Sequence, residues 1–326
     1  MAVIGVDLGG TKLAGVLLDD DGCVLDQAWI GHTVAMDRNA IAVLGDGIDR
    51  LRRSATVRGH AVRGIGVSIA GWLDVSRSHV VHAANLALSG VALQIELEGR
   101  HDLPVRIGND GDCTLLGEHA AGAARGSHNA VLLTLGTGVG GAVLVDGRLL
   151  VGNRGIAGEL GHLPVTTGGE ICICGGQGCL EQQVSGAALA RVAMRLAANG
   201  DSPHLVAVEG PVGARELGEA ARAGDSAASR AIATAAEALA VAIRMLIPVT
   251  DPEVVVLGGS VSEGLGDLLL PQVTGLLASA PRPLAEHLKA PRVVTAAMTT
   301  NAAATGAAYL VLAELSPQQD IIEANR

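Results

Sequence analysis

The sequence contains almost no aromatic side chains: no Phe, one Tyr and two Trp among 326 residues. Proteins that hold single-stranded nucleic acid stack bases on aromatic rings, so this scarcity argues against such a platform. Runs of Lys and Arg are also absent, and a net charge of −10 opposes binding to a phosphate backbone. Since 49% of the residues are hydrophobic, we expect an aliphatic core large enough for one large domain or two lobes.

No uninterrupted apolar segment is long enough to span a membrane. The longest apolar stretch, residues 131–145, is broken by several glycines. The first residues form a strand-like run that ends in Asp7, which is unlike a signal peptide. We therefore expect a cytoplasmic protein in a reducing compartment, with neither a membrane nor nucleic acid as its partner.

Strand-like and helix-like segments alternate along the chain, which is typical of an α/β protein. We predict strands at residues 2–7, 13–18, 23–29, 64–68, 105–108, 131–134, 141–145, 148–151, 254–257 and 293–296. We predict helices at residues 38–57, 91–101, 110–123, 185–198, 225–247 and 301–315. Ser185 is expected to cap the fourth of these helices and Gly200 to stop it, and Pro248 to end the fifth.

One pattern occurs twice: strand, Gly/Thr turn, strand, Asp-Gly turn, strand. The first copy begins at residue 2 and contains Asp21-Gly22, and the second begins at residue 131 and contains Asp146-Gly147. Because an internal duplication constrains the fold, we expect two similar lobes with a cleft between them.

Four potential metal ligands are crowded into one segment. They are His162, Cys172, Cys174 and Cys179. A Cys₃His set suits a closed, structural zinc site, and the interleaved glycines let a short loop bring the sulfurs together. A chance cluster of small residues and a disulfide are the alternatives, but neighbouring cysteines bridge poorly and the cytosol is reducing. A metal here would also fix the flanking carboxylates of Glu159 and Glu181.

Two glycine-rich turns occupy equivalent places in the two copies. They are Asp7-Leu-Gly-Gly-Thr-Lys12 and Gly136-Thr-Gly-Val-Gly-Gly141. Bare backbone N–H groups and a threonine hydroxyl can bind phosphate oxygens, and Asp7 can hold Mg²⁺. The first segment lacks Walker spacing, and an ordinary Gly-Gly hairpin is its alternative. The second, equivalent turn favours the phosphate-binding interpretation. A third turn, Gly258-Gly259, suits either a plain strand-to-helix connection or a contact with a purine.

Asp110 follows a predicted strand and opens a predicted helix. Functional groups of α/β proteins gather at the carboxyl ends of strands, so Asp110 is a candidate general base that takes a proton from a sugar hydroxyl during phosphoryl transfer. A simple helix cap is the alternative. Asn109, Glu159 and Glu181 would orient the attacking hydroxyl, and Asn85 is a further loop amide suited to a polyol or to a turn.

Together these segments resemble the ROK family (repressors, open reading frames, kinases) of sugar kinases. The matching segments are Asp7-x-Gly-Gly-Thr-Lys12, Asn109-Asp110 with Gly117-Glu118, Leu135-Gly-Thr-Gly-Val-Gly-Gly141, Gly152-x₂-Gly-x-Ala-Gly-Glu-x-Gly-His162 and Cys172-x-Cys-Gly-x₂-Gly-Cys-x-Glu181. They span nearly the whole chain. The segment from Glu181 to Leu189 is most similar to the bacterial ATP-dependent glucokinases of that family.

The resemblance implies an actin-like ATPase (ribonuclease H-like) α/β fold, duplicated and two-lobed, with sugar in the interlobe cleft. It implies a homodimer or homotetramer. The corresponding lobes would be a small one, residues 1–109 plus 302–326, and a large one, residues 110–301, which carries the zinc-binding loop.

The resemblance also assigns roles to residues. Asp110 would be the catalytic base for attack by the 6-hydroxyl of glucose. The sugar ligands would be Gly71, Asn85, Asn109, Asp110, Glu159, His162 and Glu181. The ATP-binding residues would be Asp7, Gly9, Gly10, Thr11, Lys12, Gly136, Thr137, Gly138, Gly140, Gly258 and Gly259, with Mg²⁺ accompanying the ATP. Zinc would bind His162, Cys172, Cys174 and Cys179, and the other ring nitrogen of His162 would face a sugar hydroxyl.

Three departures from the family pattern bear on the choice of sugar. Ala70-Gly71 replaces Pro-Gly, Asn85-Leu-Ala-Leu replaces a segment with Pro or Trp, and residues 111–114 are less rich in alanine. A kinase for N-acetylmannosamine, N-acetylglucosamine, fructose or allose is therefore an alternative, as are polyphosphate as the donor and a non-catalytic ROK-type sugar sensor or regulator. A repressor is disfavoured because Asp7 lies too near the initiator for a preceding DNA-reading domain.

Overall fold

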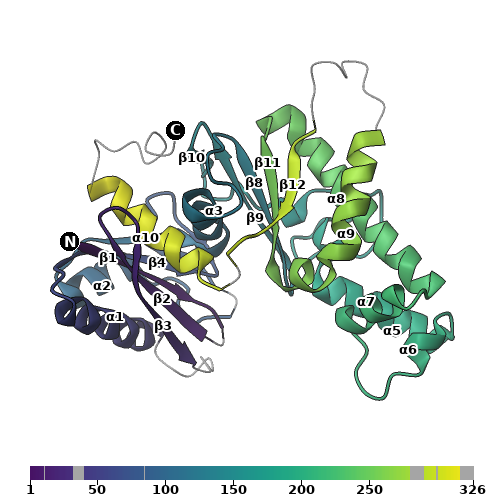
Figure 1. Cartoon of the computed structure of the whole chain (residues 1–326), viewed down its shortest axis with the longest axis horizontal. Helices are drawn as coiled ribbons and strands as arrows, with labels where there is room; N and C mark the ends of the chain where they lie inside the picture. The colour runs from purple at the N-terminus through teal and green to yellow at the C-terminus, as the bar shows by residue number, and fades with distance from the viewer. Residues whose placement is uncertain (11, 32–39, 84, 280–289, 299, 316–326) are drawn as a thin grey trace. The chain divides into compact units, whose positions relative to one another are not determined.

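The computed structural model describes residues 1–10, 12–31, 40–83, 85–279, 290–298 and 300–315. The chain forms two compact units (Figure 1). Unit 1 comprises Met1–His128, Gly147–Gly158 and Ala297–Arg326, and unit 2 comprises Asn129–Asp146 and Glu159–Ala296.

The first sheet has five strands in the order β3-β2-β1-β4-β7. Its strands are β1 (Ala2–Leu8), β2 (Lys12–Asp19), β3 (Val24–Gly31), β4 (Val62–Ile69) and β7 (Val105–Asn109). The other elements of unit 1 are α1 (Ala40–Val57), β5 (Trp72–Leu73), β6 (Val80–His82), α2 (Leu93–His101), α3 (Asp110–Ala121) and α10 (Ala302–Leu315).

The second sheet repeats this arrangement in the order β10-β9-β8-β11-β12. Its strands are β8 (Ala130–Leu135), β9 (Val139–Val145), β10 (Arg148–Leu149), β11 (Val254–Gly258) and β12 (Arg292–Thr295). In both sheets an antiparallel hairpin (β1–β2, β8–β9) is followed by parallel strands (β4 and β7, β11 and β12). The duplication predicted from the two sets of turns is therefore confirmed.

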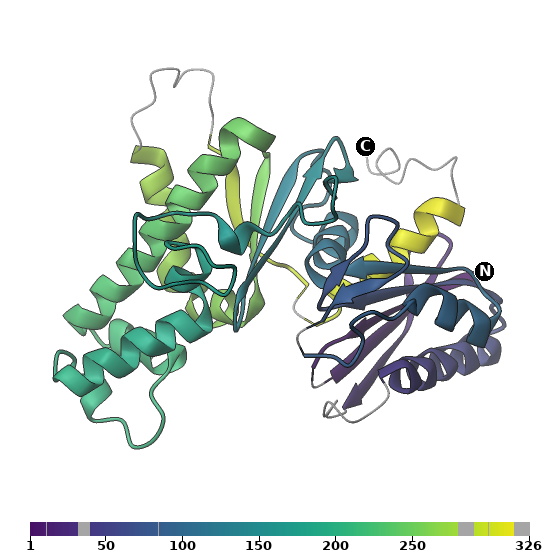
Figure 2. The same cartoon turned by 180° about the vertical axis from the view of Figure 1, so that it is seen from behind.

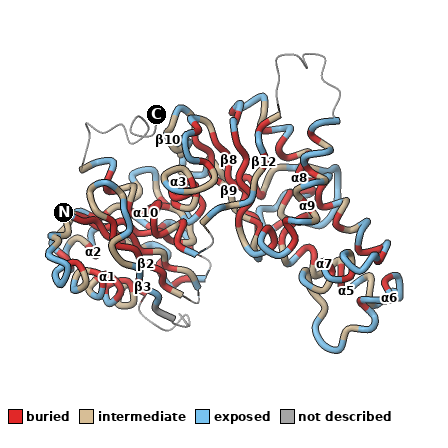
Figure 3. Tube along the Cα trace, viewed as in Figure 1, coloured by how far each residue is buried: buried red, intermediate tan, exposed pale blue. Residues whose placement is uncertain are grey.

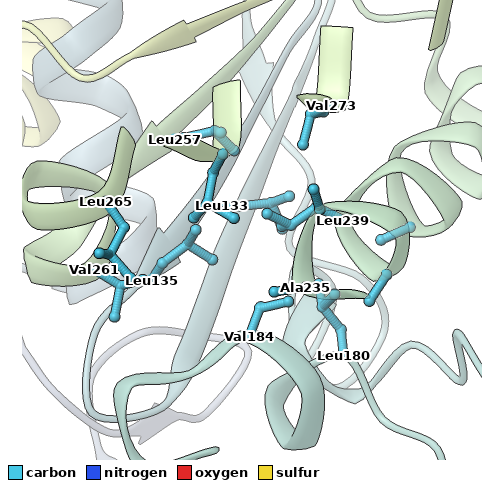
Figure 4. Packing of buried hydrophobic residues seen from close by; sticks show 14 of the residues in the cluster. Leu133, Leu135, Leu180, Val184, Ala235, Leu239, Leu257, Val261, Leu265 and Val273 are labelled. Carbon is cyan, nitrogen blue, oxygen red and sulfur yellow. The ribbon is translucent and has the colours of Figure 1, made fainter. Parts of the chain in front are cut away.

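The helices of unit 2 follow the second hairpin. They are η1 (Leu160–His162), α4 (Glu181–Val184), α5 (Gly186–Asn199), α6 (Pro203–Val206), α7 (Ala214–Arg222), α8 (Ser226–Thr250) and α9 (Gly259–Ser279). Aliphatic side chains of β8, β11, α8 and α9 enclose the main core of this unit, among them Leu133, Leu257, Leu239 and Leu265 (Figure 4). The buried residues follow the strands of the sheets (Figure 3), and no aromatic ring belongs to this core cluster.

The two faces of the first sheet are covered by different helices. Alternate residues of β1, such as Ile4 and Val6, join the core formed with α1 and α2, whereas Val3 packs with α10. Helix α10 approaches the sheet closely, because a Cβ on Gly66 of β4 would overlap the carbonyl of Ala307. Glycine and alanine thus allow a dense core where aromatic residues are missing.

Helix α3 is held at both ends. The Asn109 side chain caps its N-terminus by accepting from the N–H groups of Gly111 (2.8 Å) and Asp112 (3.4 Å). At the other end, the fully buried Glu118 carboxylate accepts from the N–H groups of Ala123, Ala297 and Met298 at 2.6, 3.1 and 2.7 Å. These bonds fix the orientation in which α3 presents its first residue, Asp110.

The boundary between the compact units differs from the predicted lobe boundary at residues 109/110 and 301/302. Helix α3 belongs to unit 1 because it packs along α10, which the prediction had already assigned there. Glycine permits this contact, since a Cβ on Gly306 would overlap the carbonyl of Cys113 in α3.

Most predicted elements are confirmed to within a few residues. The prediction that Pro248 ends a helix is wrong: α8 continues to Thr250 and stops at Asp251, which adopts a left-handed conformation (φ 40°). A proline there removes only one backbone bond near the end of a long helix, and the buried Thr250 adds a hydroxyl bond to the carbonyl of Leu246 (3.0 Å). Residues 148–151 form only the two-residue strand β10, and residues 38–39 of the first predicted helix lie outside the described residues.

Within the described ranges, α8 is the one helix whose length and apolar composition would allow it to span a membrane. Half of its most apolar window is buried inside the protein. Its apolar face contributes Ile232, Leu239 and Ile243 to the core of unit 2, which accounts for its composition.

Candidate functional site

The four predicted metal ligands meet at one point of unit 2. The His162, Cys172, Cys174 and Cys179 ligand atoms all lie within 4.8 Å of one another. The Nδ1 atom of His162 is 3.5 Å from Cys172 Sγ, and the Sγ atoms of Cys174 and Cys179 are 3.6 Å apart. A tetrahedral zinc with Zn–S of about 2.3 Å and Zn–N of about 2.0 Å requires separations of about 3.5 to 3.8 Å. The cluster therefore fits a structural zinc ion held by three sulfurs and one imidazole.

The loop between η1 and α4 folds back on itself to form this cluster, on the side of unit 2 that faces the viewer in Figure 2. Antiparallel bridges join Pro164 to Cys179 and Ile171 to Gln177. Gly178 has a positive φ of 76°, and a Cβ there would overlap the carbonyl of Thr166, so the fold-back requires glycine.

The thiols of the cluster would need a compensating positive charge to ionise together. All five cysteines are free. Burial raises the pKa of Cys179 to about 12, whereas a hydrogen bond from the Gly176 N–H lowers the pKa of Cys174. Neighbouring sulfurs cannot all ionise without a compensating charge, and a divalent cation supplies that charge.

Glu159 and His162 lie at the two ends of the short 3₁₀ helix η1. Glu159 immediately precedes this 3₁₀ helix, and its carbonyl accepts from the N–H of His162 (3.1 Å). Side chains three residues apart are eclipsed in a 3₁₀ helix, so we expect the half-buried Glu159 and His162 to lie on one face. Because Nδ1 of His162 faces the cysteines, the opposite nitrogen is available to a ligand on this face.

Glu181, the third residue of unit 2 predicted to bind sugar, is the first residue of α4. Its Oε2 accepts from the N–H of Val139 (2.9 Å), and its Oε1 lies 4.0 Å from Cys172 Sγ. The carboxylate therefore lies between the cysteine cluster and the β8–β9 hairpin.

The β8–β9 hairpin is a tight turn over residues 136–138. The N–H of Gly136 donates to the carbonyl of Gly138 (2.9 Å), and Leu135 pairs with Val139. Gly136 has a φ outside the positive range, and a Cβ there would meet no protein atom within 4 Å. Neither backbone conformation nor packing explains glycine at this position, whereas close approach by a phosphate does.

The β1–β2 turn of unit 1 is equivalent. The N–H of Gly9 donates to the carbonyl of Lys12 (2.9 Å), and a Cβ on Gly10 would meet nothing within 4 Å. Thr11, a predicted ATP ligand, lies outside the described residues. The Lys12 ammonium lies 4.7 Å from the centre of the Trp29 ring, a cation–π contact that the sequence did not suggest.

Asp7 is the penultimate residue of β1, next to this turn. Desolvation by burial raises the pKa of its carboxyl group, while the Ser68 hydroxyl donates to Oδ1 (2.7 Å). A carboxylate in such surroundings is stabilised by a cation, and oxygen ligands of this kind are those that Mg²⁺ prefers.

The third glycine turn has a structural explanation. Gly259 adopts a positive φ of 85°, and a Cβ there would lie 2.5 Å from the carbonyl oxygen of Leu135. The turn from β11 into α9 therefore requires glycine at this position, whether or not Gly258 and Gly259 contact a purine.

Asp110 is exposed and is the first residue of α3. Because Asn109 caps the helix, Asp110 does not serve as the N-cap. The same Asn109 donates from Nδ2 to the carbonyl of Gly71 (3.0 Å), so the structure brings Gly71, Asn109 and Asp110 together. The positive end of the helix dipole stabilises a carboxylate at the first helical position.

Two further residues hold this region, and their connection was not predicted. Arg77, between β5 and β6, donates to Asp112 Oδ2 (2.6 Å), and both side chains are largely buried. Asp112 lies in residues 111–114, which depart from the family pattern. This departure is the feature of the sequence that could have pointed to the ion pair. Asn85 is exposed on a turn of the same unit.

The predicted residues thus form two groups. Unit 1 carries Asp7, Gly9, Gly10, Lys12, Gly71, Asn85, Asn109 and Asp110, and unit 2 carries Gly136, Thr137, Gly138, Gly140, Glu159, His162, the three cysteines, Glu181, Gly258 and Gly259. Each unit therefore presents one glycine hairpin and a set of polar side chains suited to hydroxyl groups.

Comparison with known proteins gives concordant matches over nearly the whole chain. The model of the ROK family matches residues 3–314. A protein named glucokinase from Halalkalibacterium halodurans is 33% identical over 90% of this chain and 88% of its own length. The ROK hexokinase of Thermus thermophilus is similar in structure, with a TM-score of 0.80 and 33% identity over 96% of this chain and all of the other. A ROK family glucokinase of Streptomyces griseus, solved with glucose and AMPPNP, has a TM-score of 0.72 and 31% identity over 95% of this chain and 99% of its own.

Proposed function

The chain belongs to the ROK family, and from this premise we propose that it transfers the γ-phosphate of ATP to the 6-hydroxyl of glucose. Its fold is the duplicated actin-like ATPase fold of that family. A relative named glucokinase at 33% identity and a glucokinase structure with glucose and AMPPNP support both the sugar and the donor.

The observation that carries the proposal is the position of Asp110 at the start of α3. Asn109 caps the helix in its place, and the carboxylate is exposed. Asp110 would accept the proton of the 6-hydroxyl as that oxygen attacks the γ-phosphorus. Glu159, His162, Glu181, Asn85, Asn109 and Gly71 would bind the other hydroxyls and orient the sugar.

The glycine hairpins would hold the nucleotide. Backbone N–H groups at Gly10, Thr137 and Gly138 would bind phosphate oxygens, helped by Lys12 and the Thr11 and Thr137 hydroxyls. The N–H groups of Gly9 and Gly136 close their own turns, so these two glycines would contribute by letting a phosphate approach the backbone closely. Asp7 would hold the Mg²⁺ that accompanies ATP and offsets the phosphate charge. Gly258 and Gly259 would lie against the base.

Zinc, when bound by His162 and the three cysteines, supplies a structural crosslink and no reaction step. These ligands would hold Glu159, His162 and Glu181 on one wall for the sugar. Free cysteines and a thiolate metal site suit a reducing compartment, so we place the reaction in the cytoplasm, in glycolytic sugar phosphorylation, and expect a homodimer or homotetramer.

The runner-up changes only the sugar, to N-acetylmannosamine, N-acetylglucosamine, fructose or allose. The ion pair between Arg77 and Asp112 supports keeping it open, because this pair shapes the chain between Gly71 and Asp110 in a segment that departs from the family pattern. A non-catalytic sugar sensor is the candidate from another class.

A coupled assay of ADP release over a panel of hexoses and N-acetylhexosamines tests the proposal. We expect glucose to give the highest kcat/KM with ATP, and polyphosphate to be a poor donor. A higher kcat/KM for another sugar would correct the substrate, and no ADP release with any sugar would favour the sensor.

A further inference from the structure

One carboxylate connects the cysteine cluster with the glycine hairpin of unit 2. Glu181 follows Cys179 closely, and its two oxygens face different neighbours. Oε2 accepts from the N–H of Val139 at 2.9 Å, at the point where the hairpin turn enters β9. Oε1 lies 4.0 Å from Cys172 Sγ. A residue expected only to bind sugar therefore also holds the backbone of the predicted nucleotide turn.

Backbone bonds hold the same turn from the same segment. The N–H of Gly186 donates to the carbonyl of Gly136 (2.7 Å), and that of Ala187 to the carbonyl of Thr137 (3.4 Å). The bond from the Val139 N–H to Glu181 is a third contact with this turn, and it is made by a side chain. The chain from Glu181 to Ala187 thus supports the turn at three positions: residues 136, 137 and 139.

The fit between Glu181 and the turn is tight. A Cβ on Gly138 would lie 2.5 Å from Glu181 Oε2, which is closer than carbon and oxygen can approach without a clash. Gly138 has no positive φ, so alanine there would meet no left-handed strain and would act mainly by displacing the carboxylate. Gly138 is therefore explained by its contact with Glu181 as well as by the approach of a phosphate.

Charge alone does not explain this arrangement. A carboxylate beside a turn that binds phosphate repels the ligand, so Glu181 weakens nucleotide binding electrostatically. Glu181 compensates for this repulsion by geometry, because its hydrogen bond with the Val139 N–H fixes the orientation of the turn.

We propose that Glu181 is a positioning residue for the nucleotide, which fixes the β8–β9 turn and couples sugar binding to nucleotide binding through its second oxygen. The inference rests on the proposed function for the identity of the two ligands. A ligand that orders Glu181 from the sugar side would pre-order the turn, and the coupling must act equally in both directions.

Three variants of the full-length protein separate this role from a sugar contact. Glu181→Ala removes both oxygens. Glu181→Gln keeps an acceptor for the Val139 N–H and removes the charge. Glu159→Ala is the matched control, because Glu159 is a predicted sugar ligand of the same wall whose carboxylate has no hydrogen bond to the hairpin among the described residues.

The measurement is calorimetric binding of AMPPNP with Mg²⁺, without and with saturating glucose. Without glucose, we expect Glu181→Ala to lose about 5- to 20-fold in AMPPNP affinity, the effect of one lost hydrogen bond to a charged acceptor. Glu181→Gln should stay within about twofold of the wild type or bind more tightly, and Glu159→Ala should be unchanged. Glucose should tighten AMPPNP binding in the wild type but not in Glu181→Ala.

Gly138→Ala tests the coupling from the other side. Displacement of Glu181 should weaken glucose binding measured without nucleotide, although residue 138 lies in the nucleotide turn. The zinc content and melting temperature of each variant report whether the loop that carries the cysteine cluster is intact. If Glu181→Ala does not fold, Glu181→Gln is compared with the wild type instead.

Nucleotide affinity of Glu181→Ala equal to that of the wild type would overturn the proposal. So would an equal loss in Glu181→Gln, or unchanged glucose affinity in Gly138→Ala. Failure of the proposed function itself has a different signature: the wild-type protein would then form no glucose 6-phosphate from glucose and MgATP, whatever the variants do to binding.

Discussion

At the scale of single residues, the roles of Asn109 and Asp110 depend on each other. Either could cap a helix by residue type, and the sequence left capping open for Asp110. In the structure the Asn109 amide caps α3 and also binds the carbonyl of Gly71. Asp110 therefore occupies the first helical position without the capping role, which favours a chemical one.

Replacement of Asp110 tests that role. We expect Asp110→Ala to retain glucose binding and to lose at least about 100-fold in kcat, because general base catalysis typically contributes that much or more. Steady-state kinetics and calorimetric glucose titration check this together. A normal kcat would rule out Asp110 as the base.

Asp225 illustrates a purely structural carboxylate. It caps α8 by accepting from the N–H groups of Ala227 (2.9 Å) and Ala228 (3.0 Å), and it also accepts from the Ser202 hydroxyl (2.7 Å). These bonds, with that from Ala228 first, lower the pKa of Asp225 to about 2. Since the folded pKa lies below that of the unfolded chain, the stabilisation is present above about pH 4 and is lost as the pH falls through 2.

The lowered pKa of Asp225 in the folded protein predicts how the stability of Asp225→Asn depends on pH. We expect the variant to be less stable than the wild type by roughly 1–2 kcal/mol near neutral pH, since asparagine still caps but carries no charge. The difference should shrink as the pH is lowered from 4 toward 2. Urea denaturation at several pH values measures it, and a difference that grows on acidification would contradict the assignment.

At the scale of elements, the cysteine loop is a local structure that the sequence predicts well. The ligand spacing and Gly178 suffice to indicate a closed Cys₃His site, and the four ligand atoms lie within 4.8 Å. The bond from Glu181 to Val139 could not be predicted, because it depends on how the loop packs against a distant hairpin.

Loss of one thiolate should weaken the loop as a unit. We expect Cys174→Ala to lose zinc, measured by atomic absorption, and to raise KM for glucose about tenfold or more, as when metal ligands and their partners are disturbed. Cys23→Ala is a matched control, because Cys23 is exposed in unit 1 outside the cluster. An unchanged KM in metal-free Cys174→Ala would show that the loop does not position Glu159, His162 and Glu181.

The contact of α3 with α10 shows what the aliphatic composition permits. Gly306→Ala would drive a methyl group into the carbonyl of Cys113, so we expect destabilisation by about 1–3 kcal/mol or more. Gly275→Ala in α9, where a Cβ meets nothing within 4 Å, should instead stabilise the protein by about 1 kcal/mol through helix propensity. Chemical denaturation of both variants provides the comparison, and a neutral Gly306→Ala would contradict the close approach.

Sequence patterns predicted elements where local chemistry dominates and failed where tertiary contacts do. Asp-Gly turns and glycine hairpins marked the duplicated strands, and Ser185 and Gly200 marked the ends of α5. Pro248 misled because a proline near the end of a long helix removes only one backbone bond, so α8 continues to Thr250. The pairing of Arg77 with Asp112, like the placement of α3 beside α10, joins residues too far apart in sequence for any periodicity to indicate.

At the scale of the whole molecule, duplication explains how one chain would serve two ligands. Each sheet contributes a hairpin with glycine where its own packing does not require it, at Gly10 and Gly136. Unit 1 carries the proposed base and the proposed Mg²⁺ ligand, Asp110 and Asp7, and unit 2 carries the proposed sugar ligands Glu159, His162 and Glu181 and the cysteine cluster. The central claim is that these parts together phosphorylate glucose from ATP.

The most direct test follows the products of purified protein with glucose and MgATP by phosphorus NMR. The account predicts that glucose 6-phosphate and ADP form in equal amounts, and that neither forms when glucose is omitted. Phosphate on another hydroxyl, or no sugar phosphate at all while glucose and nucleotide both bind, would contradict it.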